Sequence, residues 1–234
     1  MLHKYRSKMR WFLFRVRVKI EDGLSIFIGK IVNISRHYSI EKLKDIELKI
    51  FPIPFPRDKK KQFMVEIGSG HGEVLERIAK NKVQIVGFEW RKRFARESSI
   101  RIARFDHAFV YYANAYKYIP MIFEKQSIDG IYVLFPDPWH KEKHHKRRPL
   151  TKSFFEQMEP LLVKGGFILF ASDWQEYVDF VKQQVSMVDH IYDIEIGEYV
   201  PEKFDLPATH YYKKWVRKNR QFTYILLKKR DHNS

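Results

Sequence analysis

The stretch VEIGSGHG (65–72) holds residue types that bind ligands at a strand end. An apolar run containing Glu66 leads into Gly68, Gly70 and Gly72. Glycines at this spacing let the backbone turn tightly and approach a bound molecule. A plain strand-to-helix turn is the alternative interpretation of the loop taken by itself.

Two acidic residues indicate which ligand such a loop binds. Glu89 ends the next apolar run, where a carboxylate accepts two hydrogen bonds from a ribose diol. A nicotinamide dinucleotide prefers G-x-G-x-x-G, whereas the spacing here is G-x-G-x-G and Glu66 repels a pyrophosphate. Glu66 suits a cation, so S-adenosylmethionine, which carries a sulfonium and an amino group, fits better.

A second stretch, LFPDPWHKEKHHKRRP (134–149), joins an acidic residue to a dense basic run. Pro136 and Pro138 restrict the backbone, so Asp137 is held rigidly where a substrate meets the cofactor, and Trp139 offers a stacking surface. Five cations follow: Lys141, Lys143, Lys146, Arg147 and Arg148. They predict a phosphate-binding surface; a solvated loop is the alternative.

The charge of the whole chain agrees with an anionic partner. Its 44 Lys and Arg exceed its 28 Asp and Glu, giving a net charge of +16, which favours nucleic acid over the solvated surface of a heat-stable protein. Cysteine is absent, and no apolar stretch has the length of a membrane span. We expect a soluble, cytoplasmic protein with no membrane association.

Apolar runs alternate with helical patterns after residue 61. Strands are expected at 63–67, 83–88, 108–112, 128–135, 167–171, 191–199 and 221–228, and helices at 73–80, 91–104, 151–162 and 174–188, with a turn at Gly165-Gly166. Alternation of this kind predicts an α/β fold with a mostly parallel sheet covered on both faces. Ligands of such sheets bind at the carboxyl ends of the strands.

The first 60 residues read differently from the rest. Residues 11–20 alternate apolar and polar side chains and, with 24–32, predict a β-hairpin. A short helix is expected near 40–49, and the proline-rich stretch 51–56 resembles a linker. We therefore divide the chain into an N-terminal extension (1–60) and a main domain (61–234).

With these motifs assembled, the chain resembles the bacterial single-chain tRNA (guanine-N7-)-methyltransferase family. The matching pieces are VEIGSGHG (65–72), GFE (87–89), FPDPWHKEKHHKRR (135–148), ASDW (171–174) and PATHYY (207–212). The resemblance implies a class I S-adenosylmethionine-dependent methyltransferase fold, Rossmann-like, with a seven-stranded sheet. It also implies methyl transfer to N7 of guanine 46 in the variable loop of tRNA.

Roles for individual residues follow from the same resemblance. It implies that the cofactor is bound by Glu66, Glu89 and Asn114 together with the glycines and Asp137, and that Asp137 is the catalytic residue. Lys141 and Asp173 match substrate-binding positions. The tRNA-contacting segment corresponds to Lys143, His144, His145, Lys146, Arg147 and Arg148.

The late substrate motif departs from the family pattern of Thr-Lys-Phe/Tyr-Glu. Here it is Thr209, His210, Tyr211 and Tyr212, so the basic residue has become His and the acid has become Tyr. Many relatives also have Asp where this chain has Asn114, whose carbonyl oxygen still accepts a hydrogen bond from the adenine amino group. The departures concern base recognition more than the type of reaction.

Guanine N7 has an in-plane lone pair and no proton, so methylation there needs no general base and no metal. Asp137 is expected to accept from the N1–H and N2–H edge and to offset the positive charge that develops on the ring. Three alternatives remain: methylation of another RNA guanine or a protein side chain, an RNA-binding protein with weakened catalysis, and, less favoured, a nicotinamide oxidoreductase. Both a monomer and a homodimer are compatible with the sequence.

Overall fold

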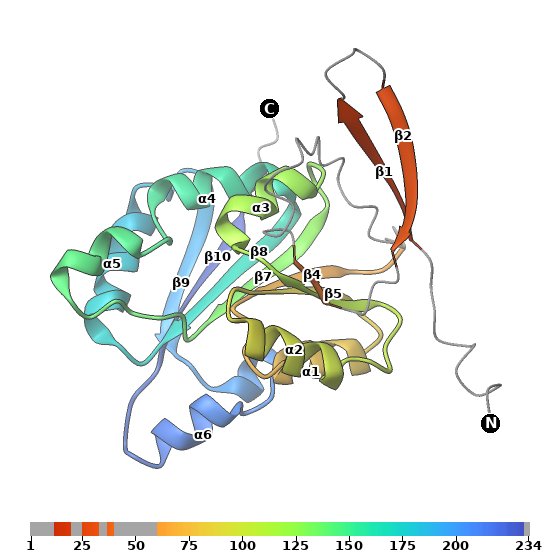
Figure 1. The fold of residues 1–234 in the computed structure, drawn as a ribbon. Coiled ribbons are helices and arrows are strands. Elements are labelled where there is room, and N and C mark those ends of the chain that lie inside the picture. Colours follow the sequence, from red (N-terminus) through yellow and green to blue (C-terminus); the bar gives the residue numbers. More distant parts are fainter. Residues whose placement is uncertain (1–11, 20–24, 33–36, 40–59, 232–234) are drawn as a thin grey trace.

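The computed structural model describes residues 12–19, 25–32, 37–39 and 60–231 (Figure 1). Its centre is an eight-stranded sheet in the order β3-β6-β5-β4-β7-β8-β10-β9. These strands are β3 (His37–Ser39), β4 (Phe63–Ile67), β5 (Gln84–Glu89), β6 (Ala108–Tyr112), β7 (Ile128–Leu134), β8 (Leu162–Ser172), β9 (Tyr192–Glu198) and β10 (Thr223–Lys229).

The strands from β4 onward give the predicted sheet of seven. The pairs β4–β5, β4–β7, β5–β6 and β7–β8 are parallel, and β10 enters antiparallel between β8 and β9. All five residues of β4 are buried, as expected for a parallel strand covered on both faces. The predicted α/β fold class is confirmed.

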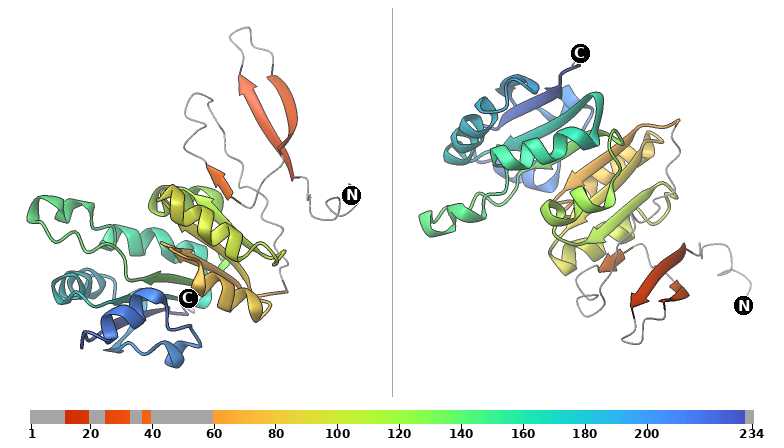
Figure 2. Two further views of the ribbon diagram at one scale, coloured as in Figure 1. Left: turned by 60° about the horizontal axis from the view of Figure 1, so that its bottom comes forward. Right: turned by 90° about the horizontal axis from the view of Figure 1, so that it is seen from above.

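Helices cover both faces of the sheet (Figures 1 and 2). The α-helices are α1 (Glu73–Lys80), α2 (Lys92–Arg101), α3 (Ala115–Ile122), α4 (Lys152–Met158), α5 (Gln175–Ser186) and α6 (His210–Val216); 3-10 helices are η3 (Glu142–Arg147), η4 (Glu159–Leu161) and η5 (Pro201–Phe204). Apolar residues of α3, α4 and α5 fill one core and those of α1 and α2 the other. Alternate residues of β4 face the two cores, Val65 toward the first and Met64 toward the second.

Two local features differ from the predictions. Helices α3 and α6 follow strand ends where the sequence pattern gave no helix. The predicted turn at Gly165-Gly166 lies inside β8, where it is a bulge, because Ile128 pairs with Leu162 but Gly130 pairs with Phe167. The hairpin predicted from residues 11–20 and 24–32 agrees with the structure, where β1 (Phe12–Lys19) and β2 (Ser25–Val32) are paired antiparallel.

The segment before residue 60 also reaches the main sheet, since β3 pairs in parallel with β6. The expected helix near 40–49 lies outside the described residues, and the division of the chain at residue 60 stays a prediction. Within the described part of the chain, no helix is both long and apolar enough to cross a bilayer.

Candidate active site

A cavity of about 800 Å³ opens at the carboxyl ends of the parallel strands. Five segments line it: the glycine loop after β4, the end of β5 with the start of α2, the residues after β6, the loop after β7, and α6. Ten of the predicted site residues are among its lining residues: Glu66, Gly68, Gly70, Glu89, Asn114, Asp137, Arg147, Thr209, His210 and Tyr211. Side chains expected to bind the cofactor and side chains expected to bind the acceptor therefore share one space.

The glycine loop has little freedom because α2 packs directly beneath it. Gly72 has φ +75°, and a Cβ atom there would lie 2.9 Å from the Cα atom of Ser98. The Ser98 hydroxyl donates to the Gly70 carbonyl at 2.6 Å. A larger residue at position 72 would therefore separate the loop from α2 and displace the backbone that faces the ligand.

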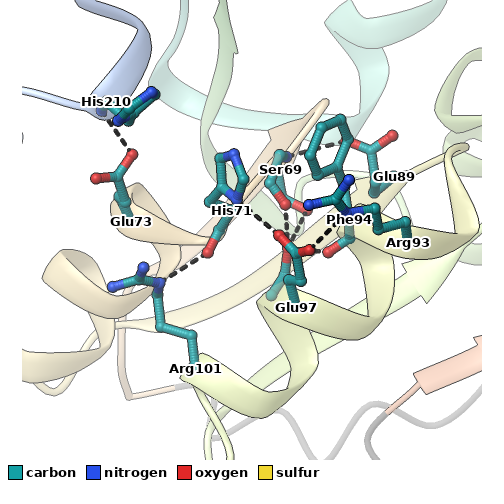
Figure 3. Close-up of polar contacts among 11 residues, drawn as sticks. Ser69, His71, Glu73, Glu89, Arg93, Phe94, Glu97, Arg101 and His210 are labelled. Carbon is teal, nitrogen blue, oxygen red and sulfur yellow. Dashed lines mark hydrogen bonds and ion pairs between the residues drawn. The ribbon is translucent and has the colours of Figure 1, made fainter. Parts of the chain in front are cut away.

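Polar contacts from α2 brace the same loop (Figure 3). The His71 ring lies 2.7 Å from a carboxylate oxygen of Glu97, and Arg101 donates to the His71 carbonyl at 2.7 Å. On the other side, Glu73 accepts a hydrogen bond from the backbone N–H of His210 at 2.8 Å. The loop is thus connected to both α2 and α6.

Glu89, at the end of β5, fastens the loop to the next strand. One of its carboxylate oxygens accepts from the Gly70 N–H at 3.0 Å and the other accepts from the Arg91 N–H at 2.8 Å. Burial raises the pKa of this carboxyl, and the two backbone donors partly offset the rise. The remaining lone pairs of the Glu89 carboxylate can still accept hydrogen bonds from the two hydroxyl groups of a ligand diol.

Glu66 has the most unusual environment in the cavity. Its side chain is buried, and its Oε2 atom has no hydrogen-bond partner among the described residues. Burial, and then the neighbouring carboxylates of Glu89 and Glu73, raise its pKa to about 8. A buried acceptor without a partner costs free energy, so this position is suited to a cationic donor.

Asn114 follows β6 and is exposed at the cavity wall. Its side-chain oxygen accepts from the Tyr116 N–H at 3.1 Å and caps the N-terminus of α3. The amide oxygen predicted to meet an adenine amino group is therefore already bound to the helix. Only its second lone pair is left for a ligand.

The loop after β7 is fixed by unusual backbone angles rather than by its prolines alone. Phe135 and Trp139 have φ values of +53° and +51°, which L residues rarely adopt. Arg148 donates to the Pro138 carbonyl at 3.0 Å. Between these points Asp137 lines the cavity, and its carboxylate pairs with Arg91 at 2.8 Å.

The basic run after this loop divides into an exposed part and a buried residue. It forms the 3-10 helix η3, with Lys141, Lys143, Lys146 and Arg147 exposed and His144 and His145 half-buried. Arg148 is only 4% exposed, and it pairs with Glu176 at 2.8 Å. The prediction that Arg148 contacts RNA is therefore wrong, because its guanidinium holds the loop from inside the protein.

The late motif begins the helix α6. The Thr209 hydroxyl accepts from the Tyr212 N–H at 3.2 Å, so it caps the helix. Tyr211 stacks on Phe135, with ring centroids 5.2 Å apart. Tyr212 packs against Phe135 and Phe222 in the core and does not line the cavity. The Tyr that replaces the family's acid thus serves packing.

Asp173 also lies away from the cavity lining. Its side chain is 4% exposed, and its two oxygens are taken by the Tyr211 hydroxyl, at 3.0 Å, and by Arg220. Arg220 in turn covers the ring of Trp215, 3.9 Å from the centroid. This arrangement does not fit the predicted direct contact of Asp173 with substrate.

Sequence reasoning missed several residues of the site. Arg91, Lys214 and Trp215 line the cavity, and Arg220 neutralises Asp173. The position of Arg91 two residues after Glu89 was the one available signal. Among the described residues, no three His, Asp or Glu side chains gather in a way that holds a metal ion.

Comparison of the sequence with known proteins identifies the family. A family model described as "Putative methyltransferase" matches residues 60–225. A tRNA (guanine-N(7)-)-methyltransferase of Legionella pneumophila is 30% identical over 189 residues, covering 75% of this chain and 78% of that protein. The chain belongs to the tRNA (guanine-N7-)-methyltransferase family.

Other relatives of the same name match over different lengths. The Actinobacillus succinogenes protein is 29% identical over 222 residues, which cover 89% of this chain and 82% of that protein. The Neisseria gonorrhoeae protein is 31% identical over 144 residues, or 62% of this chain. The chain spans about half the length, 51%, of that relative.

Solved structures show the same fold at low identity. An rRNA methylase from Streptococcus thermophilus superposes with a TM-score of 0.51 at 10% identity, over 73% of this chain and 88% of that one. Haemonchus contortus phosphoethanolamine N-methyltransferase 2, solved with S-adenosylhomocysteine, has a TM-score of 0.51 at 16% identity, over 73% and 49%. The sheet described above is therefore a methyltransferase-type sheet.

Proposed function

We propose that this protein transfers a methyl group from S-adenosylmethionine to N7 of guanine 46 in the variable loop of tRNA. One observation carries the proposal. A single cavity joins the buried carboxylates Glu66 and Glu89 to Asp137 in the proline loop. Family membership supports the reaction type, and the exposed cations beside the cavity support an RNA substrate.

The residues around the glycine loop fit S-adenosylmethionine. The unpartnered Oε2 of Glu66 suits the cofactor's ammonium group, since an ionised pair there replaces a buried acceptor without a partner. The buried carboxylate of Glu89 suits the ribose diol. When bound, the cofactor supplies an electrophilic methyl group on its sulfonium.

Asp137 is the residue assigned to the acceptor. N7 carries a lone pair and no proton, so the chain has to position the base rather than deprotonate it. The Asp137 carboxylate accepts from the N1–H and N2–H edge of guanine. It also offsets the positive charge that methylation leaves on the purine, in a site partly shielded from water. Tyr211 and Trp139 line the cavity with aromatic surface on which the base can stack.

The substrate assignment rests on charge as well as family. The chain carries a net charge of +16, and the cations of η3 stand exposed next to the cavity wall formed by Arg147. Such a surface binds phosphates without reading sequence. We therefore assign tRNA binding to this surface and selection of the base to the cavity.

The test is transfer of labelled methyl from S-adenosylmethionine to unmodified tRNA, followed by chain cleavage at N7-methylguanosine. We expect label at guanine 46, and none on a tRNA in which that guanine is replaced by adenine. Label at another guanine would correct the position while keeping the chemistry. Tight tRNA binding without label would instead favour an RNA-binding protein that has lost catalysis, consistent with the paired state of Asp173.

A further inference from the structure

The backbone around Asp137 is restrained, but the side-chain carboxylate of this residue has a single hydrogen-bonding partner among the described residues. Positive φ angles at Phe135 and Trp139 hold the loop. The side chain itself is 44% exposed, and among the described residues its one hydrogen-bonding partner is Arg91, at 2.8 Å from Oδ2. The direction of this carboxylate is therefore set by Arg91.

Arg91 is itself held at several points. Its backbone N–H donates to Glu89 at 2.8 Å, directly before the first residue of α2. Its guanidinium lies 5.5 Å from the ring centroid of Trp90 and 5.9 Å from that of Phe94. Cation–π contacts of this length restrict an otherwise mobile side chain.

Together these contacts connect the glycine loop to Asp137 through Arg91. Glu89 accepts from the backbone N–H groups of Gly70 and Arg91, and the Arg91 guanidinium donates to Asp137. Gly70 and Glu89 belong to the part of the cavity assigned to the cofactor, and Asp137 belongs to the part assigned to the acceptor. Arg91 is the residue that joins the two parts.

We propose that Arg91 is a positioning residue that aims the Asp137 carboxylate at the methyl acceptor and links that aim to the cofactor carboxylate Glu89. The inference rests on the proposed methyl transfer to guanine. Arg91 binds Oδ2 of Asp137, so Oδ1 can accept a hydrogen bond from a base edge. A misaligned carboxylate accepts poorly from N1–H, so the loss falls on turnover rather than on ligand binding.

The position allows a clean test, because an ion pair with both partners this exposed contributes little to folding stability. We compare Arg91→Met, Arg91→Lys and, as a matched control, Arg96→Met, which removes an exposed arginine from α2, the helix that begins just after Arg91. Steady-state kinetics are measured against both S-adenosylmethionine and tRNA. Arg91→Met should lower kcat about 10- to 100-fold, with both KM values within about threefold of wild type, since neither ligand is bound by the guanidinium.

Two further comparisons separate positioning from structural damage. Arg91→Lys should recover part of the lost kcat, because an ammonium still reaches a carboxylate. In an Asp137→Asn background, Arg91→Met should cost little more, since a residue that acts through Asp137 has nothing left to aim. Arg96→Met should behave as wild type.

Several results would overturn the inference. These are an unchanged kcat for Arg91→Met, a loss confined to the KM for S-adenosylmethionine, or an equal loss in the Asp137→Asn background. Wild-type protein is assayed first. If it transfers no methyl to guanine, the proposed function fails and the inference fails with it; if it does, a failure of the Arg91 variants concerns the inference alone.

Discussion

The carboxylates in the two halves of the cavity differ in whether they have a partner within the chain. In the cofactor half, formed by the glycine loop 68–72 with Glu66 and Glu89, both carboxylates are buried, and Glu66 keeps an oxygen without a hydrogen-bond partner among the described residues. In the acceptor half, formed by the loop 135–139 and α6, the Asp137 carboxylate pairs with Arg91, and Asp173, outside the cavity lining, pairs with Arg220.

The difference shows which half depends on its ligand. Among the described residues no cationic side chain pairs with Glu66, so a cationic ligand that reaches it removes an electrostatic penalty. In the acceptor half Asp137 already has an arginine partner, so a base that enters has to share or exchange that hydrogen bond. The affinity for the cofactor should therefore depend on the ionisation of Glu66 and on pH. The rate of transfer to the base should depend on the orientation of the side chains that hold it.

The largest expected effect tests the acceptor half. Asp137→Ala should lower kcat by about 10²–10³-fold, the range seen when one group that stabilises developing charge is removed. Binding of tRNA should survive, because the cations of η3 remain in place. Methyl-transfer kinetics and a filter-binding assay measure the two quantities separately.

The control for this variant is Asp193→Ala, which removes an exposed carboxylate paired with Arg230 at the far edge of the sheet. It changes the net charge equally and should leave kcat unchanged. Turnover near the wild-type level in Asp137→Ala would show that the acceptor is held elsewhere, and the assignment of the two halves would fall.

The next effect tests the cofactor half. Glu66→Gln should weaken S-adenosylmethionine binding about 10- to 100-fold at pH 7.5, the loss expected for a buried charge-assisted hydrogen bond. Wild-type affinity should rise between pH 6 and pH 7.5, because burial raises the pKa of Glu66 to about 8 and a proton has to leave before the ammonium binds. Calorimetric titration at several pH values measures both. An affinity that is independent of pH in the wild type would contradict the assignment.

The same carboxyl predicts the opposite trend for the empty protein. In the folded protein Glu66 keeps its proton up to about pH 8, whereas in the unfolded chain it loses it near 4.5. Between these values the folded state binds more protons, so the free energy of unfolding falls as pH rises, by up to about 1.4 kcal/mol per unit. Glu66→Gln should flatten this slope in urea unfolding experiments without ligand. A slope that remained equally steep in the variant would assign it to other groups.

A smaller effect separates two adjacent arginines. Arg147→Ala should weaken tRNA binding and reduce the salt slope by about one, as for one lost phosphate contact, with stability nearly unchanged. Arg148→Ala should lower the free energy of unfolding by about 1–3 kcal/mol, because it removes a buried guanidinium and its partly buried hydrogen bonds to Pro138 and Glu176. Its salt slope should match that of wild type. If the two variants gave the same salt slope, the division between exposed and buried cations would be wrong.

The sequence predicted the parts of the fold that depend on local periodicity. Strand 63–67, helix 73–80 and strand 108–112 are found with the predicted bounds, because continuous or 3.6-residue apolar patterns report burial directly. Helix α6 was missed because it carries no apolar stripe: its Tyr211 and Tyr212 instead pack against the aromatic rings of Phe135 and Phe222. The bulge in β8 depends on pairing with β7, which no local pattern contains.

For the site, the sequence predicted which segments line the cavity more accurately than which side chains face a ligand. The glycine loop and Asp137 line the cavity as expected. In contrast, Arg148 and Asp173 are turned inward by Glu176 and Arg220, residues that lie 28 and 47 positions away in the chain. Whether a charged side chain faces a ligand or a partner depends on such distant residues, so its type and spacing alone do not decide it.

The smallest expected effect concerns the hydrogen bonds that Asp173 accepts from its partners. Tyr211→Phe removes the hydroxyl that donates to Asp173 at 3.0 Å and keeps the ring that stacks on Phe135. We expect a loss of about 0.5–1.5 kcal/mol in the free energy of unfolding, the net value of one hydrogen bond, and a kcat within about threefold of wild type, since the stacking surface is retained. A kcat more than about tenfold lower would mean that the hydroxyl leaves Asp173 to bind the base. In that case the acceptor half would exchange its hydrogen bonds at Tyr211 as well as at Arg91, and Asp173 would regain the substrate role that its buried, paired position argues against.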